Sequence, residues 1–257
     1  MARTTSSNNA LWVHADYLSL TDGDETKVRF FYENVHHDKY KHIVFVSNEA
    51  KESYLSIFPE RKNVCLVINN IINFESIRNK SQEEIDIGRD TTKFTFLNVG
   101  RHFEKQKKLS RLIEASYKLK QEGLSFRVLL VGDGPDSNYY KKMVTDFKLQ
   151  NEIIFIGKKK NPYPYFKISD CLVLSSDYEG YPVVFIESLV LGLPIITTDV
   201  SDSLEEIDEK FGYVTRKSAD DIYTYMKKFM QEGFIMQGRF DPVGYNEEQI
   251  SKIKKIL

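Results

Sequence analysis

The sequence predicts an α/β protein in which a doubly wound parallel sheet follows a smaller α/β unit. From residue 94 onward, short apolar stretches of strand length alternate with longer stretches of helical periodicity. The apolar stretches show no polar alternation, which is typical of parallel strands that helices cover on both faces. This part of the chain alone contains enough elements for a complete domain.

The elements of this part follow one another without long gaps. Strands are expected over 94–100, 126–132, 152–157, 171–175, 194–198 and 212–214. Helices are expected over 110–123, about 137–148, near 163–168, 182–191 and 218–231. The first of these helices ends at Gly123, a residue that commonly stops helices.

The first 85 residues predict a second, smaller sheet. Strands are expected over 10–15, 42–47 and 64–69, with one or two helices between them. Three strands make a small sheet, which falls short of an ordinary domain of about 100–150 residues. The expected divisions are a polar leader (1–9), the partial amino-terminal domain (10–85), a linker (86–93), the carboxyl-terminal domain (94–235) and a final helix (236–257).

The final helix is expected to be amphipathic, with Ile250, Ile253 and Leu257 on one side. Its lysines at 252, 254 and 255 either form the solvated face of a docking helix or contact an anionic membrane surface. The solvated face is the favoured interpretation.

Composition excludes several classes of protein. The formal net charge is −1, so nucleic-acid binding by bulk electrostatics is not expected. Cys65 and Cys171 lie in apolar stretches and are expected to be buried, reduced thiols. The start resembles no signal peptide, and no apolar run approaches the roughly 18 residues that span a bilayer. We expect a cytoplasmic protein, at most peripheral on the inner face of the membrane.

The stretch E-G-Y-P-V-V-F-I-E carries two carboxylates, Glu179 and Glu187, in an otherwise apolar run. A helix that is apolar nearly all round is buried, and a buried carboxylate must be paired or hydrogen-bonded. The partner of Glu187 is either a Lys, an Arg or backbone amides, or a ligand with two adjacent hydroxyls such as a ribose. Glu179 is either an exposed turn residue or a neighbour of bound phosphate.

The turn before this helix has the features of an anion site. Gly180 is flexible, and Pro182 suits the first position of a helix. Backbone amides at a helix N-terminus, with the positive end of the helix dipole, bind phosphate. In a parallel sheet this turn lies at the carboxyl edge, where ligands bind.

A basic loop, G-R-H-F-E-K-Q-K-K, follows another strand and places Arg101, Lys105, Lys107 and Lys108 at the same edge. These side chains either bind a diphosphate opposite the helix N-terminus or form a solvated loop.

A third strand end, V-G-D-G-P, contains Gly132 and Gly134, which would let the backbone approach a ligand closely. As a dinucleotide-binding fingerprint it is poor, because the third glycine position is Ser137. A nicotinamide-dependent dehydrogenase is therefore disfavoured.

Together these motifs resemble one family. The E-x7-E spacing is similar to the signature of retaining glycosyltransferases of the GT-B fold, and more narrowly of the group 1 glycosyltransferases (family four of the retaining enzymes). The basic loop is similar to that family's G-R-x-x-x-x-K-G loop. The resemblance covers 94–235 closely and 10–80 loosely. It implies a GT-B-like fold with a complete Rossmann-like carboxyl-terminal domain.

The resemblance implies a nucleotide-diphosphate sugar as donor and a glycan or lipid-linked acceptor in cell-surface polysaccharide synthesis. No nucleic acid, metal or other cofactor is expected. Arg101 and Lys107 would hold the diphosphate, and the amides of Tyr181 to Val184 its distal phosphate. The residues assigned to donor binding besides Glu187 are Gly180, Tyr181, Pro182, Val183, Val184, Gly132 and Gly134.

The same resemblance implies that Glu187 binds the ribose hydroxyls and Glu179 the hydroxyls of the donor sugar. His14, at the end of an amino-terminal strand, either faces the donor sugar across the cleft or is structural. The implied reaction retains anomeric configuration through front-face attack, with the basic residues stabilising the leaving diphosphate.

The sequence also departs from the family pattern. Lys108 stands where the family has glycine, and T-D-V-S-D-S replaces an aspartate followed by two glycines. No strand with a glycine-rich loop precedes W-V-H-A, so we expect the start of the amino-terminal domain to be missing. The alternative function is therefore a catalytically silent nucleotide-sugar-binding module.

Two patterns that could suggest a metal are interpreted otherwise. D-G-D at 22–24 lies in a polar loop and is expected to be a solvated turn. His36, His37 and His42 lack the spacing of a helical metal pair.

Overall fold

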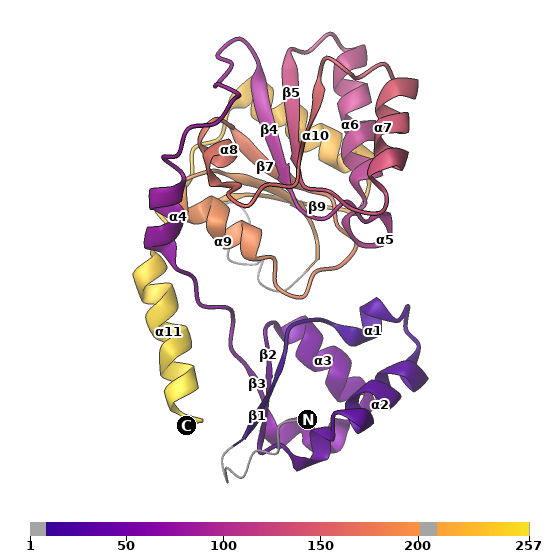
Figure 1. Cartoon of the computed structure of the whole chain (residues 1–257), viewed down its shortest axis with the longest axis vertical. Helices are drawn as coiled ribbons and strands as arrows, with labels where there is room; N and C mark the ends of the chain where they lie inside the picture. Colours follow the sequence, from indigo (N-terminus) through magenta and orange to yellow (C-terminus); the bar gives the residue numbers. More distant parts are fainter. Residues whose placement is uncertain (1–8, 201–209, 257) are drawn as a thin grey trace.

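The computed structural model describes residues 9–200 and 210–256, which form two separate parallel sheets with flanking helices (Figure 1). This arrangement confirms the predicted α/β class. Of the sequence-based expectations, the leader up to residue 8, residues 201–203 of the T-D-V-S-D-S segment and Leu257 lie outside the described residues.

The amino-terminal sheet has the strand order β1-β2-β3, with both pairs parallel. Its strands are β1 (Ala10–Val13), β2 (His42–Phe45) and β3 (Cys65–Val67). Its helices are α1 (Tyr17–Leu20), α2 (Glu25–Asn34), η1 (His37–Lys39), α3 (Asn48–Ile57) and η2 (Pro59–Val64). Asp16, Asp24 and Ser47 cap α1, α2 and α3 by accepting backbone N–H groups, which fixes where each helix begins.

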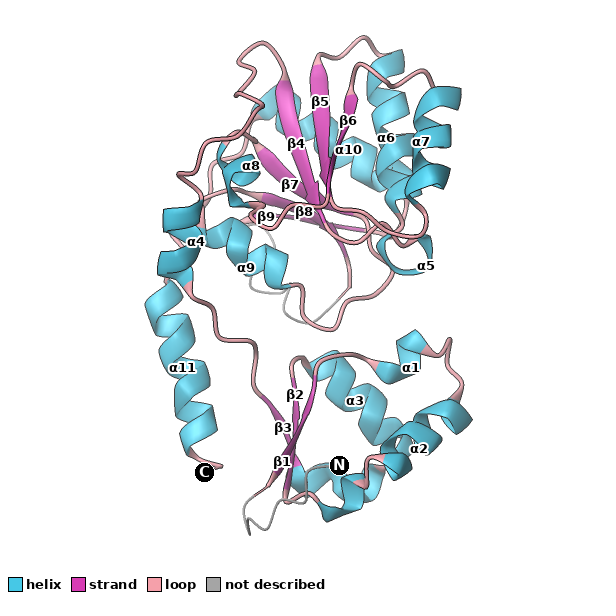
Figure 2. Cartoon of the chain, in the orientation of Figure 1, coloured by secondary structure: helices cyan, strands magenta, loops and turns pink. Residues whose placement is uncertain are grey.

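The carboxyl-terminal sheet has six parallel strands in the order β6-β5-β4-β7-β8-β9 (Figure 2). The strands are β4 (Phe94–Val99), β5 (Phe126–Val131), β6 (Ile153–Gly157), β7 (Cys171–Leu174), β8 (Ile195–Thr198) and β9 (Gly212–Thr215). The chain builds outward from β4 to β6, then returns to the other side of β4 with β7. The switch point of the sheet therefore lies between β4 and β7, and ligands of such sheets bind at the carboxyl ends of the strands there.

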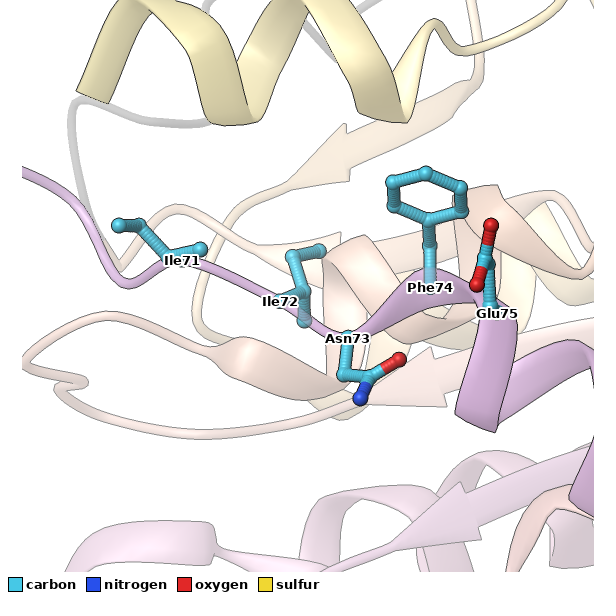
Figure 3. Close-up of a pocket in the computed structure, with 5 residues that line it drawn as sticks. All are labelled: Ile71, Ile72, Asn73, Phe74 and Glu75. Carbon is cyan, nitrogen blue, oxygen red and sulfur yellow. The ribbon is translucent and has the colours of Figure 1, made fainter. Parts of the chain in front are cut away.

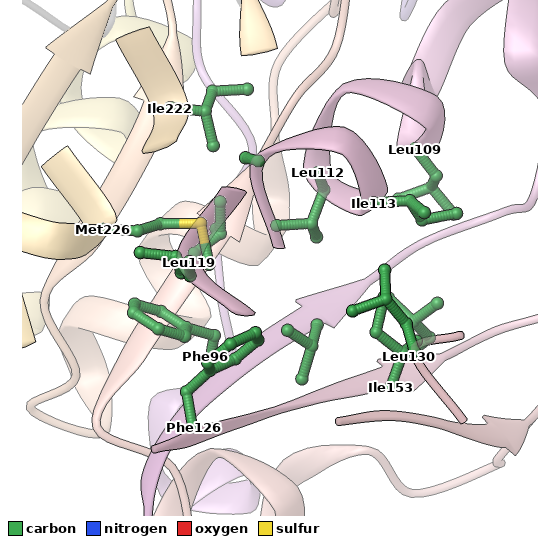
Figure 4. Close-up of a cluster of buried hydrophobic side chains, with 14 of the residues drawn as sticks. Phe96, Leu109, Leu112, Ile113, Leu119, Phe126, Leu130, Ile153, Ile222 and Met226 are labelled. Carbon is green, nitrogen blue, oxygen red and sulfur yellow. The ribbon is translucent and has the colours of Figure 1, made fainter. Parts of the chain in front are cut away.

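Helices cover both faces of this sheet, as the unbroken apolar strands predict. They are α5 (Glu104–Lys107), α6 (Leu109–Gln121), α7 (Ser137–Asp146), α8 (Tyr163–Lys167), α9 (Val183–Val190) and α10 (Ala219–Glu232). On one face Leu112 and Leu119 of α6 and Met226 of α10 pack on Phe96 and Phe126 of the sheet (Figure 4). On the other face α8 and α9 pack against the opposite side chains of the same strands. The sheet edge between β4 and β7 is thereby set in a rigid frame.

Two segments connect the halves. One runs over 68–73 from β3 to α4 (Phe74–Lys80), and α4 packs against α8 and α9 of the carboxyl-terminal half. The other is α11 (Pro242–Lys254), which extends from the carboxyl-terminal half back toward the amino-terminal sheet (Figure 1). The expected boundary between residues 85 and 86 stays a prediction.

The structure does not bury Ile250, which the sequence predicts to share one side of an amphipathic helix with Ile253 and Leu257. Ile250 is 38% exposed, whereas Pro242 and Gln249 are buried. The physical reason is that α11 docks on extended backbone, whose N–H and C=O groups require amide partners rather than an apolar stripe. None of the helices within 9–200 and 210–256 combines the length and the hydropathy that a membrane-spanning helix requires.

Candidate active site

The site forms where the loops after β4 and β7 meet at the switch point. The backbone N–H of Asp177 donates to the carbonyl of Gln106 at 2.8 Å, and the Ser175 hydroxyl donates to the carbonyl of Lys107 at 2.9 Å. The basic loop is held further by Glu104, which accepts hydrogen bonds from the Ser110 and Tyr140 hydroxyls. The structure therefore brings the two sequence motifs into direct contact.

An ion pair between Lys107 and Glu179 lies at the centre of this contact. The Lys107 Nζ atom is 2.6 Å from Glu179 Oε1, and the two side chains are 18% and 7% exposed. The Ser176 hydroxyl donates to the same oxygen of Glu179 at 2.6 Å. Because the pair is largely removed from water, breaking it by removing one partner would leave an uncompensated charge. Glu179 is thus a buried residue and not an exposed turn residue.

Lys108, the departure from the family pattern, adopts the left-handed conformation, with φ 46° and ψ 45°. Glycine adopts this conformation at no steric cost, whereas other residues do so with strain. The Lys108 ammonium lies 3.7 Å from Glu104 and 3.8 Å from Asp177, two ion pairs that offset part of that strain. The loop keeps the backbone shape that a glycine would take at this position.

The other two basic residues of the loop do not reach the pair. Arg101 is exposed, and its guanidinium lies over the Phe103 ring, 5.0 Å from the centroid. Lys105 instead contacts Asp22 of the amino-terminal half at 2.6 Å. Of the predicted phosphate ligands, only Lys107 lies against Glu179 in this structure.

The turn between Glu179 and α9 contacts the amino-terminal half directly. A Cβ atom added at Gly180 would lie 2.6 Å from the backbone oxygen of His14, so only glycine permits this approach. His14 is exposed and follows β1, and its backbone is what meets the turn. The structure brings both predicted residues together across the two halves.

The expectation of four amide donors at the start of α9 needs correction. Pro182 has no N–H group, and the N–H of Val183 donates to the carbonyl of Tyr181 at 2.9 Å. The helix accordingly begins at Val183, one residue later than predicted, with Pro182 as its N-cap residue. At most the amides of Tyr181 and Val184 could serve a phosphate.

Glu187 lies on α9 behind this turn and is largely buried. The Tyr163 hydroxyl donates to its Oε1 atom at 2.9 Å. Burial raises the pKa of the Glu187 carboxyl, and the Tyr163 hydrogen bond opposes this shift only in part. Tyr163 is a functional candidate that sequence reasoning missed, because nothing in N-P-Y-P-Y-F indicates which tyrosine faces α9.

The two glycines after β5 have a structural reason that the sequence did not reveal. A Cβ atom at Gly132 would lie 1.8 Å from the carbonyl oxygen of Gly100, and one at Gly134 would lie 2.3 Å from that of His102. Close packing against the β4 loop therefore requires glycine at both positions. His102 itself was not predicted; it is buried, its Nδ1 atom is hydrogen-bonded to the Ser137 hydroxyl, and burial lowers its pKa.

Within residues 9–200 and 210–256, no group of three or more His, Cys, Asp or Glu residues is placed to hold a metal ion. Cys65 and Cys171 are free thiols, and burial raises the pKa of both. Cys171 is fully buried and Cys65 is only half-buried.

Known proteins share this sequence pattern and fold. The family model of the glycosyl transferases of group 1 matches residues 79–246. An uncharacterized glycosyltransferase of Methanocaldococcus jannaschii is 31% identical over 78% of this chain and 51% of its own length. The N-acetylgalactosamine-N,N'-diacetylbacillosaminyl-diphospho-undecaprenol 4-alpha-N-acetylgalactosaminyltransferase of Campylobacter jejuni is 24% identical over 77% of this chain and 52% of its own length.

Among solved structures, HepE of Anabaena in complex with UDP and glucose superposes with a TM-score of 0.77 at 17% identity. It covers 95% of this chain, which corresponds to 71% of HepE. This likeness shows a common fold. The chain spans about half the length of both relatives named above.

Proposed function

The chain belongs to the group 1 glycosyl transferases, and on that premise we propose that it moves a sugar from a nucleotide-diphosphate sugar to a glycan or lipid-linked acceptor. We propose further that the transfer retains anomeric configuration and needs no resident metal. The observation that carries the proposal is the buried contact between Lys107 and Glu179, at the switch point of a parallel sheet and beside a helix N-terminus. The UDP bound to HepE and the lipid-diphosphate acceptor named for the Campylobacter enzyme support the choice of substrates.

In this proposal the Lys107–Glu179 ion pair exists in the enzyme without substrate, and the donor displaces it. The diphosphate takes over the Lys107 ammonium, with Arg101 swinging in from its exposed position. Glu179, released from the lysine, then accepts hydrogen bonds from the donor sugar. Glu187 binds the ribose hydroxyls in a site whose burial strengthens those hydrogen bonds.

The reaction then breaks the bond between the anomeric carbon and the distal phosphate oxygen. The acceptor oxygen bonds to the same face of that carbon, and its proton passes to the departing phosphate. Lys107 and Arg101 stabilise the negative charge that grows on the diphosphate, which is the electrostatic part of the catalysis. Each step uses only side chains of this chain and groups of the two substrates.

Calorimetry with uridine, guanosine and adenosine diphosphates tests donor binding. We expect one of them to bind, and Lys107→Met to weaken that binding about tenfold or more, because a charge-assisted hydrogen bond is lost. Lys142→Met is the matched control, since Lys142 is an exposed lysine on α7 that pairs with Asp146. No binding of any diphosphate at millimolar concentration would contradict the proposal.

Glu179→Gln distinguishes a Lys107–Glu179 pair that the donor displaces from a pair that only stabilises the fold. Removing the carboxylate frees Lys107, so the bare diphosphate should bind about threefold to tenfold more tightly. Transfer from the matching nucleotide sugar should nevertheless fall at least about tenfold, because the sugar loses a charged acceptor. If the variant instead binds the diphosphate more weakly, Glu179 positions Lys107 and the proposed displacement is wrong. Binding without any transfer by the unaltered chain would favour the silent binding module.

A cytoplasmic location with contact to the inner membrane face belongs to the same proposal, because a lipid-linked acceptor lies there. Lys254, the last residue of α11, and Lys255, which follows it, are exposed and are the candidate contacts. Sedimentation with anionic and neutral vesicles tests this contact: equal binding to both, or to neither, would contradict it.

A further inference from the structure

α11 holds the segment that connects the two halves through side-chain amides. Asn246 both accepts from the N–H of Ile72 at 3.1 Å and donates to its carbonyl at 2.8 Å. The Gln249 side-chain oxygen accepts the N–H of Asn69 at 3.0 Å, and Gln249 is only 2% exposed. These amides pair with backbone N–H and C=O groups of the connecting segment, as a neighbouring strand would. α11 and residues 69–72 are therefore held together by hydrogen bonds.

One tyrosine of α11 links this unit to the turn before α9. The Tyr245 hydroxyl donates to the carbonyl of Asn70 at 2.9 Å, and it lies 2.6 Å from the Tyr181 hydroxyl. A tyrosine hydroxyl has one proton, and a carbonyl can only accept. The Tyr245 proton therefore goes to Asn70, and Tyr181 is the donor in the bond between the two tyrosines. The result is a directed chain from Tyr181 through Tyr245 to Asn70.

The surroundings of this chain are apolar and packed. Ile72 of the connecting segment and Ile186 of α9 are buried in one cluster, and the rings of Tyr181 and Tyr245 pack against it. Figure 3 shows Ile72 and Phe74 pointing to one side of the connecting segment and Asn73 to the other, where Asn73 caps α4. A pocket of about 470 Å³ lies along this segment. The two hydrogen bonds of the tyrosines are part-buried beside this cluster, and the partial exclusion of water strengthens them.

We propose that Tyr245 is a positioning residue for the turn at 180–184, because its hydroxyl fixes Tyr181 to the connecting segment. The turn then has two anchors outside its own domain core: the His14 backbone at Gly180 and the α11 hydroxyl at Tyr181. An angular change between the halves moves both anchors and so moves the turn. The inference rests on the proposed function, in which this turn binds the distal phosphate of the donor.

The test compares Tyr245→Phe, Tyr181→Phe and the double variant in the full chain. Phenylalanine keeps the ring in the cluster, so a role in packing alone predicts no change. We expect Tyr245→Phe to weaken binding of the nucleoside diphosphate that the chain accepts about threefold to tenfold, since two hydrogen bonds are lost. Tyr181→Phe removes the hydrogen bond between the two hydroxyls but leaves the bond from Tyr245 to Asn70, and it should have the smaller effect. The double variant should bind the diphosphate no more weakly than Tyr245→Phe, because both substitutions interrupt the same series of hydrogen bonds.

Tyr139→Phe on α7 is the matched control, because this tyrosine is 47% exposed and distant in the sequence from the turn. Equal affinities of Tyr245→Phe and this control would overturn the proposal, as would additive losses in the double variant.

Amide hydrogen exchange without any ligand keeps the proposal testable if no diphosphate binds. Tyr245→Phe should speed exchange in the peptides that contain 69–72 and 180–184 together, because the chain of hydroxyls joins them. Faster exchange at 69–72 alone would show that Tyr245 holds only the connecting segment, which contradicts a positioning role. Faster exchange in both, without diphosphate binding by the unaltered chain, would keep the positioning role and overturn the donor site instead.

Discussion

Gly180 offers the sharpest test of how the two halves meet. A Cβ atom at this position would lie 2.6 Å from the backbone oxygen of His14 and 3.3 Å from the Cα atom of Ala15. The first distance falls about 0.8 Å short of ordinary van der Waals contact, which begins at 3.4 Å. Both neighbours are backbone atoms, so no side-chain rotation relieves the clash. Gly180→Ala must shift the turn, the end of β1, or the angle between the halves.

Overpacking of this kind costs about 1–3 kcal/mol. We therefore expect Gly180→Ala to lower the free energy of unfolding by that amount in urea titrations. If the strain is relieved by separating the halves, part of the loss will appear as weaker diphosphate binding, because the turn carries the proposed phosphate site. A loss of 1.4 kcal/mol corresponds to about a tenfold change in affinity.

Gly88→Ala is the matched control. A Cβ atom at Gly88 has no atom within 4 Å, and its φ lies outside the positive range that side chains avoid. Alanine there should be neutral or stabilise by up to about 1 kcal/mol, through the smaller entropy of the unfolded chain. If Gly180→Ala is as stable as Gly88→Ala to within about 0.5 kcal/mol, His14 and Gly180 do not approach each other in solution, and the reasoning fails.

Two further predictions concern stability. Burial raises the pKa of the Glu187 carboxyl above its ordinary 4.5, so the folded state binds the proton more tightly than the unfolded state and stability falls as pH rises above about 4.5. In urea titrations across pH 4–7, Glu187→Gln should therefore gain stability relative to the unaltered chain as pH increases. If the two stabilities change in parallel with pH, the pKa of Glu187 is not raised. Lys108 has a φ of 46°, and Lys108→Gly should change the free energy of unfolding by less than about 1 kcal/mol, because the relief of strain and the greater entropy of the unfolded chain oppose each other. Lys108→Val should cost at least about 1 kcal/mol more than Lys108→Gly. Equal stabilities of the two variants would show that the left-handed conformation is not required.

Much of the carboxyl-terminal half could be predicted because its signals are local. Continuous apolar strands, helical periodicity and glycine at strand ends all act within a few residues, and they located the six strands near their observed positions. The proximity of Lys107 and Glu179 followed from a rule of topology, that the carboxyl ends of parallel strands meet at one edge. The short helix α5, only four residues long, lies below what periodicity can detect.

The remaining features could not be predicted because their causes are distant in the sequence. Tyr163 meets Glu187 from another helix, and no local pattern selects it from the neighbouring Tyr165. The sequence indicated an apolar side of the last helix through Ile250, whereas α11 contacts an extended backbone through Asn246 and Gln249. The glycines of V-G-D-G-P suggested a ligand, yet the nearest atoms belong to the adjacent loop. In each case the role of the residue depends on a partner that is distant in the sequence, so no local pattern indicates it.

The four residues E-G-Y-P illustrate why a short motif can require a whole fold. Glu179 is held by a lysine of the loop after β4, and Gly180 is required by the backbone that follows β1. Tyr181 is bonded to a tyrosine of α11, while Pro182 sets the beginning of α9. Each of the four residues contacts or begins a different segment, and two of those segments lie outside the six-stranded domain core. The turn is consequently defined only when both halves and α11 are in place. It follows that residues 94–235 alone, which lack both β1 and α11, would present this turn without the partners of Gly180 and Tyr181.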